Sequence, residues 1–87
     1  GIELSPPRPN PNHGAGSVSF TIAEDTHARL DVFDLNGRRM ATLLDQDMAR
    51  GRHEVSFTAA TGWPAGVYLC RLDAGGAARV SRMLLVR

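Results

Sequence analysis

The sequence lacks lysine altogether and contains one cysteine, one tyrosine and one tryptophan. All ten basic residues are arginine, and the formal net charge of the 87 residues is only +1. Because acidic residues lie among these arginines, we expect a surface of mixed sign and no binding to nucleic acid. No apolar run approaches the roughly 20 residues of a membrane-spanning helix, so the composition predicts one soluble, folded domain.

The single cysteine, Cys70, excludes an internal disulfide and says nothing about the redox compartment. Catalysis by its thiol would need a partner base and a lowered pKa. The three histidines, His13, His27 and His53, are instead scattered over the first segment, a predicted loop and a predicted strand. We therefore expect Cys70 to be a small, buried apolar residue.

Other arrangements of reactive residues are equally sparse. Asp45-Gln46-Asp47 offers carboxylates to calcium, but the remaining oxygen ligands and the loop glycine of a calcium motif are absent, which favours a solvated loop. No cluster has zinc spacing, no carboxylate pair suits acid-base catalysis, and no glycine-rich loop leads into a helix. The sequence therefore predicts no enzyme, no cofactor, no metal and no small-molecule substrate.

The first part of the chain differs in composition from the rest. It begins with Gly1 and has no signal sequence, which indicates a piece of a longer protein. The stretch SPPRPNPNHGAGS contains four of the five prolines. Because proline cannot donate to a sheet, we predict that residues 1–16 form an extended lead-in or linker, with room for a short edge strand at residues 2–4, and that residues 17–87 form the body.

From Ser17 onward, apolar and polar residues alternate with a period of two, as in strands with one buried face. The predicted strands cover residues 17–22, 28–35, 38–44, 52–59, 67–74 and 78–87. In the second of these, both faces carry apolar residues, which predicts a bulge or burial on both faces. Asn36-Gly37 predicts a type I′ hairpin turn, and Gly75-Gly76 predicts another hairpin.

Six or seven short strands in fewer than about 100 residues predict an all-β, immunoglobulin-like antiparallel β-sandwich, with a small barrel as the alternative. Tyr68 and Cys70 lie two residues apart near the start of a late strand, an immunoglobulin-like arrangement. Its second cysteine is missing, since the matching early strand offers Phe20 or Ile22. Trp63 falls in a corner before this late strand and not within a strand.

Several short motifs follow one another along the chain. They are Pro9-Asn10-Pro11-Asn12, Asp34-Leu35-Asn36-Gly37-Arg38, Gly51 before a strand, Pro64-Ala65-Gly66-Val67-Tyr68, and the final Arg82-Met83-Leu84-Leu85-Val86. Each motif is weak by itself. Their order and spacing over nearly the whole chain resemble the C-terminal sorting domain of type IX secretion cargo.

The resemblance implies a non-catalytic address at the C-terminus of exported enzymes and adhesins of Bacteroidetes-type bacteria. It implies a cargo domain N-terminal in the same chain and passage through periplasm and outer membrane to the medium or cell surface. The implied partners are the type IX translocon and a sortase-like protease that attaches cargo to lipopolysaccharide. The sorting motif carried over comprises Pro9, Asn10, Pro11, Gly37, Gly66, Tyr68, Arg82, Leu84, Leu85 and Val86. Where the family often has lysine, Arg82 keeps the charge with a different geometry.

Two other function classes fit a small β-sandwich: a structural spacer and a carbohydrate-binding module. Similar sandwiches occur in the flagellar hook-cap protein and beside secreted glycoside hydrolases, so the fold alone does not decide. A glycan binder needs exposed aromatic platforms, and only Trp63 is predicted to be exposed. We expect the last strand to complete the core, and an acceptor protein to read it through backbone pairing and side-chain pockets.

Overall fold

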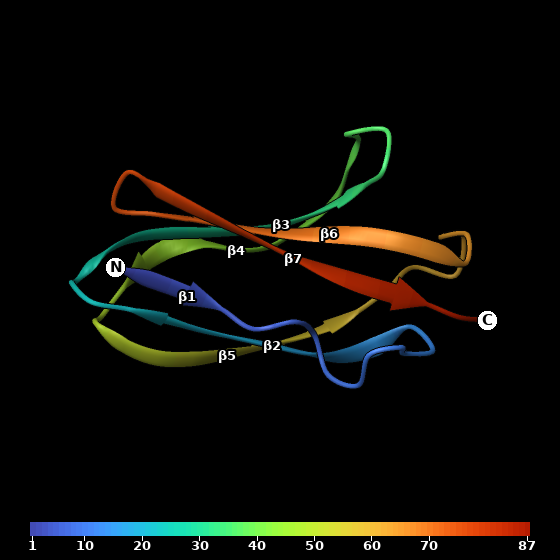
Figure 1. The fold of residues 1–87 in the computed structure, drawn as a ribbon, viewed down its shortest axis with the longest axis horizontal. Coiled ribbons are helices and arrows are strands. Elements are labelled where there is room, and N and C mark those ends of the chain that lie inside the picture. Colours follow the sequence, from blue (N-terminus) through green and yellow to red (C-terminus); the bar gives the residue numbers. More distant parts are fainter.

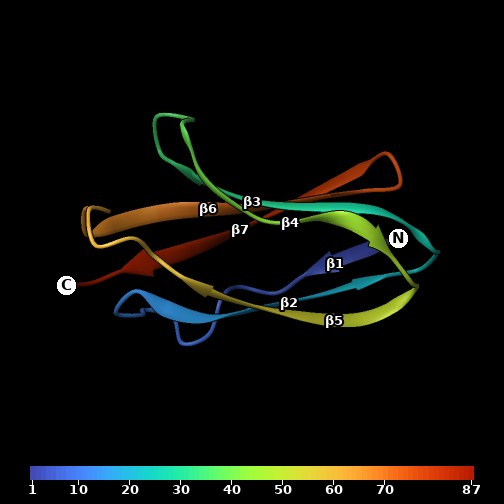
Figure 2. The same ribbon diagram turned by 180° about the vertical axis from the view of Figure 1, so that it is seen from behind.

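The chain folds into two antiparallel β-sheets packed face to face (Figures 1 and 2). The structure, a computed structural model, describes all 87 residues. Its strands are β1 (Ile2–Leu4), β2 (Ala15–Ile22), β3 (Thr26–Asp34), β4 (Arg39–Met48), β5 (Gly51–Thr58), β6 (Gly66–Ala74) and β7 (Ala77–Leu85). One sheet has the order β1-β2-β5 and the other β4-β3-β6-β7. The predicted all-β, immunoglobulin-like sandwich is confirmed. No helix in the chain is a candidate for crossing a membrane.

The predicted strands are all present, but their bounds differ from those expected, most clearly in β2 and β4. β2 begins at Ala15, and β4 continues to Met48 because its polar second half pairs with the start of β3. Asp45 and Asp47 therefore lie in an edge strand, and the prediction of a solvated loop there was wrong. The apolar alternation could not indicate this extension, because the side chains at the end of an exposed edge strand need no buried face.

The two tight hairpins differ in their turn geometry. Gly75 and Gly76 both have positive φ, at 58° and 80°, as a type I′ turn requires. At the other hairpin, Gly37 has a φ of 85° but no non-glycine residue has positive φ, so the type I′ assignment was wrong although the hairpin is present. The physical reason is Asp34, whose Oδ1 accepts hydrogen bonds from two loop N–H groups at 2.9 Å and shapes a longer turn.

A bulge or burial on both faces was predicted within residues 28–35, and the structure has two bulges where β3 pairs with β4, with the extra residues in β4. The register shifts twice, leaving Leu43 and Met40 of β4 without partners in β3. This arrangement keeps Leu30 and Val32 buried in the core while Phe33, on the opposite face, is only partly buried.

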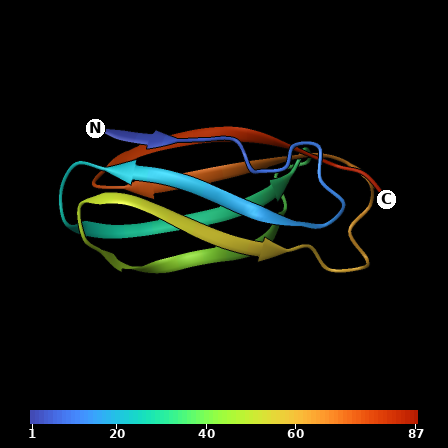
Figure 3. The ribbon, with the colours of Figure 1, turned by 90° about the horizontal axis from the view of Figure 1, so that it is seen from below.

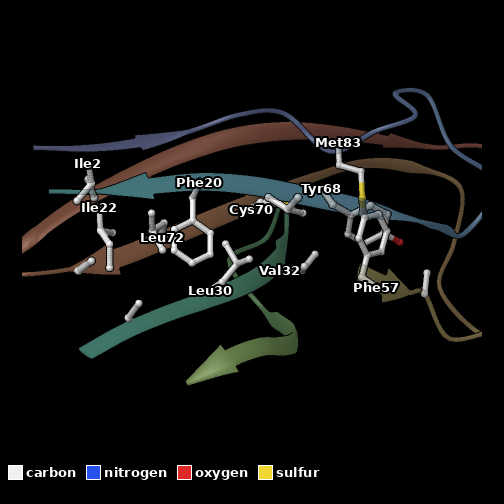
Figure 4. Packing of buried hydrophobic residues seen from close by; sticks show 14 of the residues in the cluster. Ile2, Phe20, Ile22, Leu30, Val32, Phe57, Tyr68, Cys70, Leu72 and Met83 are labelled. Atoms are coloured by element: carbon white, nitrogen blue, oxygen red, sulfur yellow. The ribbon is translucent and has the colours of Figure 1, made fainter. Parts of the chain in front are cut away.

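The space between the sheets holds fifteen buried apolar residues (Figure 4). They are Ile2, Val18, Phe20, Ile22, Ala28, Leu30, Val32, Phe57, Ala59, Tyr68, Cys70, Leu72, Ala74, Met83 and Leu85. Cys70 lies inside this cluster as a free thiol, and burial raises its pKa to about 11. The prediction that Cys70 is a small, buried core residue is therefore confirmed.

Candidate functional site

The segment between β1 and β2, residues 5–14, crosses from one sheet to the other, and we call it the strap (Figure 3). Its first half follows β2. The N–H of Ser5 donates to the carbonyl of Ser19 at 3.0 Å, and Arg8 exchanges two backbone hydrogen bonds of 2.8 Å with Ser17. A Cβ atom on Gly16 would lie 2.4 Å from the Arg8 carbonyl oxygen, so only glycine permits this approach.

The second half of the strap lies along the outer edge of β7. The N–H of Asn12 donates to the carbonyl of Leu84, and the N–H of Val86 donates to the carbonyl of Asn12, both at 2.9 Å. The side chain of Asn10 continues this ladder: Oδ1 accepts from the N–H of Leu84 at 2.9 Å, and Nδ2 donates to the carbonyl of Arg82 at 3.2 Å. The outer backbone edge of β7 is therefore occupied from Arg82 to Val86.

This occupation changes the expected role of the last strand. An acceptor that adds its own strand to a sheet needs unpaired backbone groups at the sheet edge. Along the second half of β7 those groups already bind the strap, so backbone pairing with an acceptor there requires the strap to detach. Side chains remain available for recognition while the strap is in place.

Asn12 anchors the strap inside the molecule. It is fully buried, and its Oδ1 accepts a hydrogen bond from the N–H of Gly14 at 2.9 Å. Its Nδ2 has no partner within the protein. The two prolines of the motif, Pro9 and Pro11, are exposed on either side of Asn10, and each follows a cis peptide bond.

Side chains of β7 alternate between the core and the outside. Met83 and Leu85 are 1% and 0% exposed, whereas Arg82 and Leu84 point outward. The motif residue Leu85 is thus part of the core. A shallow depression of about 290 Å³ lies beside the outward residues. Its lining comprises Asn10, Pro11, Val67, Arg82 and Leu84.

The remaining motif residues shape the end of the sandwich near this depression. Tyr68 is buried, its hydroxyl donates to the carbonyl of Pro64 at 2.5 Å, and its ring stacks on Trp63 at 5.4 Å. This bond across the corner is the one that immunoglobulin-like sandwiches use near the start of the same strand. Gly66 pairs with Leu85.

Gly37 does not line the depression. It belongs to a second depression on the outer face of the four-stranded sheet, of about 340 Å³, together with Leu35, Leu69 and Val80. The structure therefore divides the predicted motif into a group at the strap and β7, a group at the Tyr68 corner, and Gly37 in the hairpin.

Two residues of this region, Arg87 and Val67, were not singled out from the sequence. The guanidinium of Arg87 donates to the carbonyls of Trp63, at 2.8 and 3.0 Å, and Ala60, at 2.7 Å, and so ties the chain after β7 to the corner before β6. No local pattern could indicate these contacts, because they join positions 24 and 27 residues apart. The outward direction of Val67 could have been predicted from the alternation in β6, because its neighbour Tyr68 points inward.

Charge is distributed unevenly over the molecule. Residues 4–23 and 74–87, which include the strap and β7, contain no Asp or Glu. Their arginines are Arg8, Arg79, Arg82 and Arg87, and none of them forms an ion pair. The arginines that do form ion pairs lie on β3, β4 and β6 and in the hairpin of Gly37. Charges of both signs are present, as expected, but they are not evenly mixed, and the strap and β7 are basic.

A separate charged cluster lies at the other end of β3. His27 is the second residue of this strand, contrary to its predicted place in a loop. Its Nε2 is 2.6 Å from Asp45 Oδ1, and its Nδ1 is 2.9 Å from Asp47 Oδ1. The hydrogen bond to Asp45, and then that to Asp47, raises the pKa of His27. The same bond lowers the pKa of Asp45. No group of three or more metal-binding side chains is arranged to hold an ion.

Comparison with known proteins gives one clear relationship. Residues 9–87 match the family described as "Secretion system C-terminal sorting domain". A comparison with curated proteins found no significant match. The matched region begins in the strap at Pro9 and contains every motif residue singled out from the sequence. The chain therefore belongs to the type IX secretion C-terminal sorting domains, a family of sorting signals that is not known for catalysis.

Proposed function

We propose that the type IX machinery recognises this domain through a surface built jointly by the strap and the outward side of β7. The proposal rests on the hydrogen bonds between the side chain of Asn10 and the backbone of Arg82 and Leu84 in β7. These two residues lie 72 and 74 positions further along the chain. Four of the motif residues, Asn10, Pro11, Arg82 and Leu84, line one depression as a result. A signal assembled from both ends of the domain exists only after folding, so recognition would report that the domain is folded.

Membership of the family implies export across the outer membrane, to the cell surface or the medium, and a cargo region N-terminal to the domain. We further propose that a signal peptide first brings the precursor to the periplasm. Gly1, to which the cargo would be joined, lies at the opposite end of the sandwich from Arg87 (Figure 1). A cargo domain attached there would leave the strap and β7 uncovered.

Residues 1–16 and 17–87 have separate roles in this proposal. The first segment would join the cargo to the body and hold β7, and the body would present the recognition surface. A sortase-like protease is the second proposed partner. Because the lead-in is hydrogen-bonded to the body from β1 to Asn12, cleavage within it requires these residues to detach and become extended.

The alternative of a carbohydrate-binding module gains no support from the aromatic residues. Trp63 is half-buried against Tyr68, and Phe20 and Phe57 are in the core. Phe33, on the outer face, is partly buried, and the guanidinium of Arg39 lies over its ring at 5.6 Å. Sugar rings need an exposed aromatic face, and none of these side chains offers one. No contact or cavity favours a spacer over a sorting signal.

The test is export of a fluorescent reporter that carries a signal peptide and residues 1–87, in a bacterium with a working type IX system and in a translocon-deficient strain. The variants are Asn10→Ala and Leu84→Thr, which alter the depression, with Asn36→Ala in the exposed hairpin as the matched control. Removing residues 82–87 would be uninformative, because it also removes Met83 and Leu85 from the core.

We expect translocon-dependent export of the parent and of Asn36→Ala. The two depression variants should fold and yet accumulate in the periplasm, with export reduced about threefold to tenfold. Retention of the parent domain in the working strain, while a known cargo is exported, would contradict the proposed function.

A further inference from the structure

The exposed apolar side chains of the molecule gather on one side. Leu35, Val80 and Leu84 are the large hydrophobic residues with high exposure, at 66%, 57% and 40%. Leu84 and Val80 lie on the outer face of β7, and Leu35 lies in the hairpin beside that face. Isolated exposed leucines are ordinary in proteins, but a contiguous apolar patch marks a surface for interaction.

Cross-strand pairing joins these residues into one patch. Phe33 of β3 is opposite Leu69 of β6, and Leu69 is opposite Arg82 of β7. Val80 and Leu84 lie two residues before and after Arg82 on the same face of β7. We call this group the outer patch; it comprises Phe33, Leu35, Leu69, Val80, Arg82 and Leu84.

Arg82 stands among these apolar side chains without an acidic partner. Three other arginines near the patch do have acidic partners: Arg71 binds Asp73 at 3.0 Å, Arg38 lies 3.5 Å from Asp34, and Arg39 lies 3.5 Å from Asp31. Arg79, next to Val80, also lacks an acidic partner, but it alternates with the outward residues of β7 and is not part of the patch. No ion pair involves Arg82. A guanidinium ringed by aliphatic groups is a typical binding hot spot, because docking excludes water around the charge and strengthens its hydrogen bonds.

We propose that the outer patch docks onto a protein of the export machinery, on a surface where aliphatic side chains surround an Asp or Glu carboxylate that pairs with Arg82. This inference rests on the proposed sorting function and names the chemistry of its partner. The outer patch is continuous with the strap depression through Arg82 and Leu84, which belong to both. One partner surface can therefore contact the outer patch and the strap at the same time, so its binding would depend on whether the strap is in place.

The charges distinguish this partner from a second copy of the chain. Two copies meeting through the outer patch would bring Arg82 and the basic strand β7 against the same groups, with no free carboxylate on the patch to pair with them. An anionic lipid surface would be attracted by charge spread over many basic residues. Within the outer patch, Arg82 is the one basic side chain, and it has no acidic partner; the other unpaired arginines near the strap and β7, Arg8, Arg79 and Arg87, lie outside the patch. Leu69, Val80 and Leu84 lie beside Arg82, which suits one carboxylate on a shaped protein surface.

The first experiment measures export of the reporter with Arg82→Glu and Arg82→Lys. The matched control is Arg52→Glu on the outer face of the other sheet, which makes the same change in net charge. We expect at least a tenfold loss for Arg82→Glu, because like charges meet at the interface, and export within about twofold of the parent for Arg52→Glu. Arg82→Lys keeps the charge without the planar fork and should fall between them.

The second experiment identifies the partner by placing a photo-crosslinking amino acid at Val80, with Thr21 on the opposite face as the control site. We expect a protein adduct at Val80 alone, only in the strain with a translocon, and an Asp or Glu in the cross-linked peptide. Replacing that acidic residue by Arg should restore export of Arg82→Glu by at least about fivefold, because the charge pair is re-formed in reverse.

Three results of these two experiments would overturn the inference while leaving the sorting function in place. They are normal export of Arg82→Glu, an adduct at Val80 to another copy of the domain, and an adduct to a protein segment without acidic residues. Binding of the purified domain to anionic phospholipid vesicles at about 0.15 M salt, lost in Arg82→Glu, would assign the patch to a membrane and would also overturn it. Failure of the parent to be exported would instead contradict the sorting function itself.

Discussion

Both sheets contribute residues to the core, but their outer faces differ. On the three-stranded sheet the outward residues of β2 are Ser17, Ser19 and Thr21, and they pair with Ser56, Glu54 and Arg52 of β5. This face is polar throughout, as expected for a sheet with one side in water. The four-stranded sheet carries the outer patch instead. Folding requires only the inner faces, so an apolar outer face indicates a role other than stability.

The same contrast occurs within β7, where successive residues have different roles. Met83 and Leu85 complete the core, and Arg82 and Leu84 belong to the outer patch and the strap depression. The final motif therefore combines a folding function and a proposed recognition function in alternate positions. Substitutions at neighbouring positions should separate the two.

The largest effect is expected for Leu85→Ala compared with Leu84→Ala. Leu85 is 0% exposed, so its truncation should reduce the free energy of unfolding by about 2–5 kcal/mol. That is a large part of the roughly 5–15 kcal/mol available to a small domain. Truncation of Leu84, which is 40% exposed, should reduce the free energy of unfolding by less than about 1 kcal/mol. Urea unfolding of both variants measures the difference, and equal losses would contradict the assignment of the two faces.

A smaller effect is expected for Gly16→Ala, which tests how the strap is held. The new methyl group would collide with the Arg8 carbonyl at 2.4 Å and push the strap from β2, costing about 1–3 kcal/mol. Hydrogen exchange of the Leu84 and Val86 amides, whose acceptors are in the strap, should become faster. Gly62→Ala is the control, because a Cβ there meets nothing within 4 Å. Unchanged exchange in Gly16→Ala would show that the strap is not held by this contact.

The smallest effect is expected at the opposite end of the sandwich, in His27→Gln. The pKa of His27 is raised above its ordinary value of 6.5, so its protonated pairing contributes fully below 6.5 and is lost as pH rises through the folded pKa. The pKa of Asp45 is lowered from 3.8, so its contribution is lost only as pH falls below that value. The melting temperature of the variant should therefore fall slightly near pH 5 and match the parent near pH 9. A deficit that grows toward high pH would contradict this cluster.

The sequence predicted the strands and the core well, for a physical reason. The alternation in residues 17–22 records which side chains are buried, and burial is the dominant favourable term in folding. The Tyr68 corner could likewise be predicted from its spacing to Cys70. Turn type was less predictable, because one carboxylate, that of Asp34, determined the loop before Arg39.

The surface at the strap could not be predicted from the sequence in the same way. The prolines of the lead-in indicated only an extended segment, and nothing local indicated that Asn10 bonds with β7 or that Asn12 is buried. Contacts between positions more than seventy residues apart depend on how the two sheets pack. The motif residues in the lead-in and in the last strand could thus be selected separately from the sequence, but their proximity appears only in the structure.

The central claim is that the sorting signal lies on the outer face of the four-stranded sheet of the folded domain. The most direct test compares export of two multiply substituted reporters, Leu69→Thr with Val80→Thr and Arg82→Glu, and Thr21→Ala with Arg52→Glu and Ser56→Ala. Circular dichroism and thermal unfolding establish that both are folded. The account predicts that the first is retained in the periplasm and the second is exported like the parent. Equal export of the two folded reporters would contradict it.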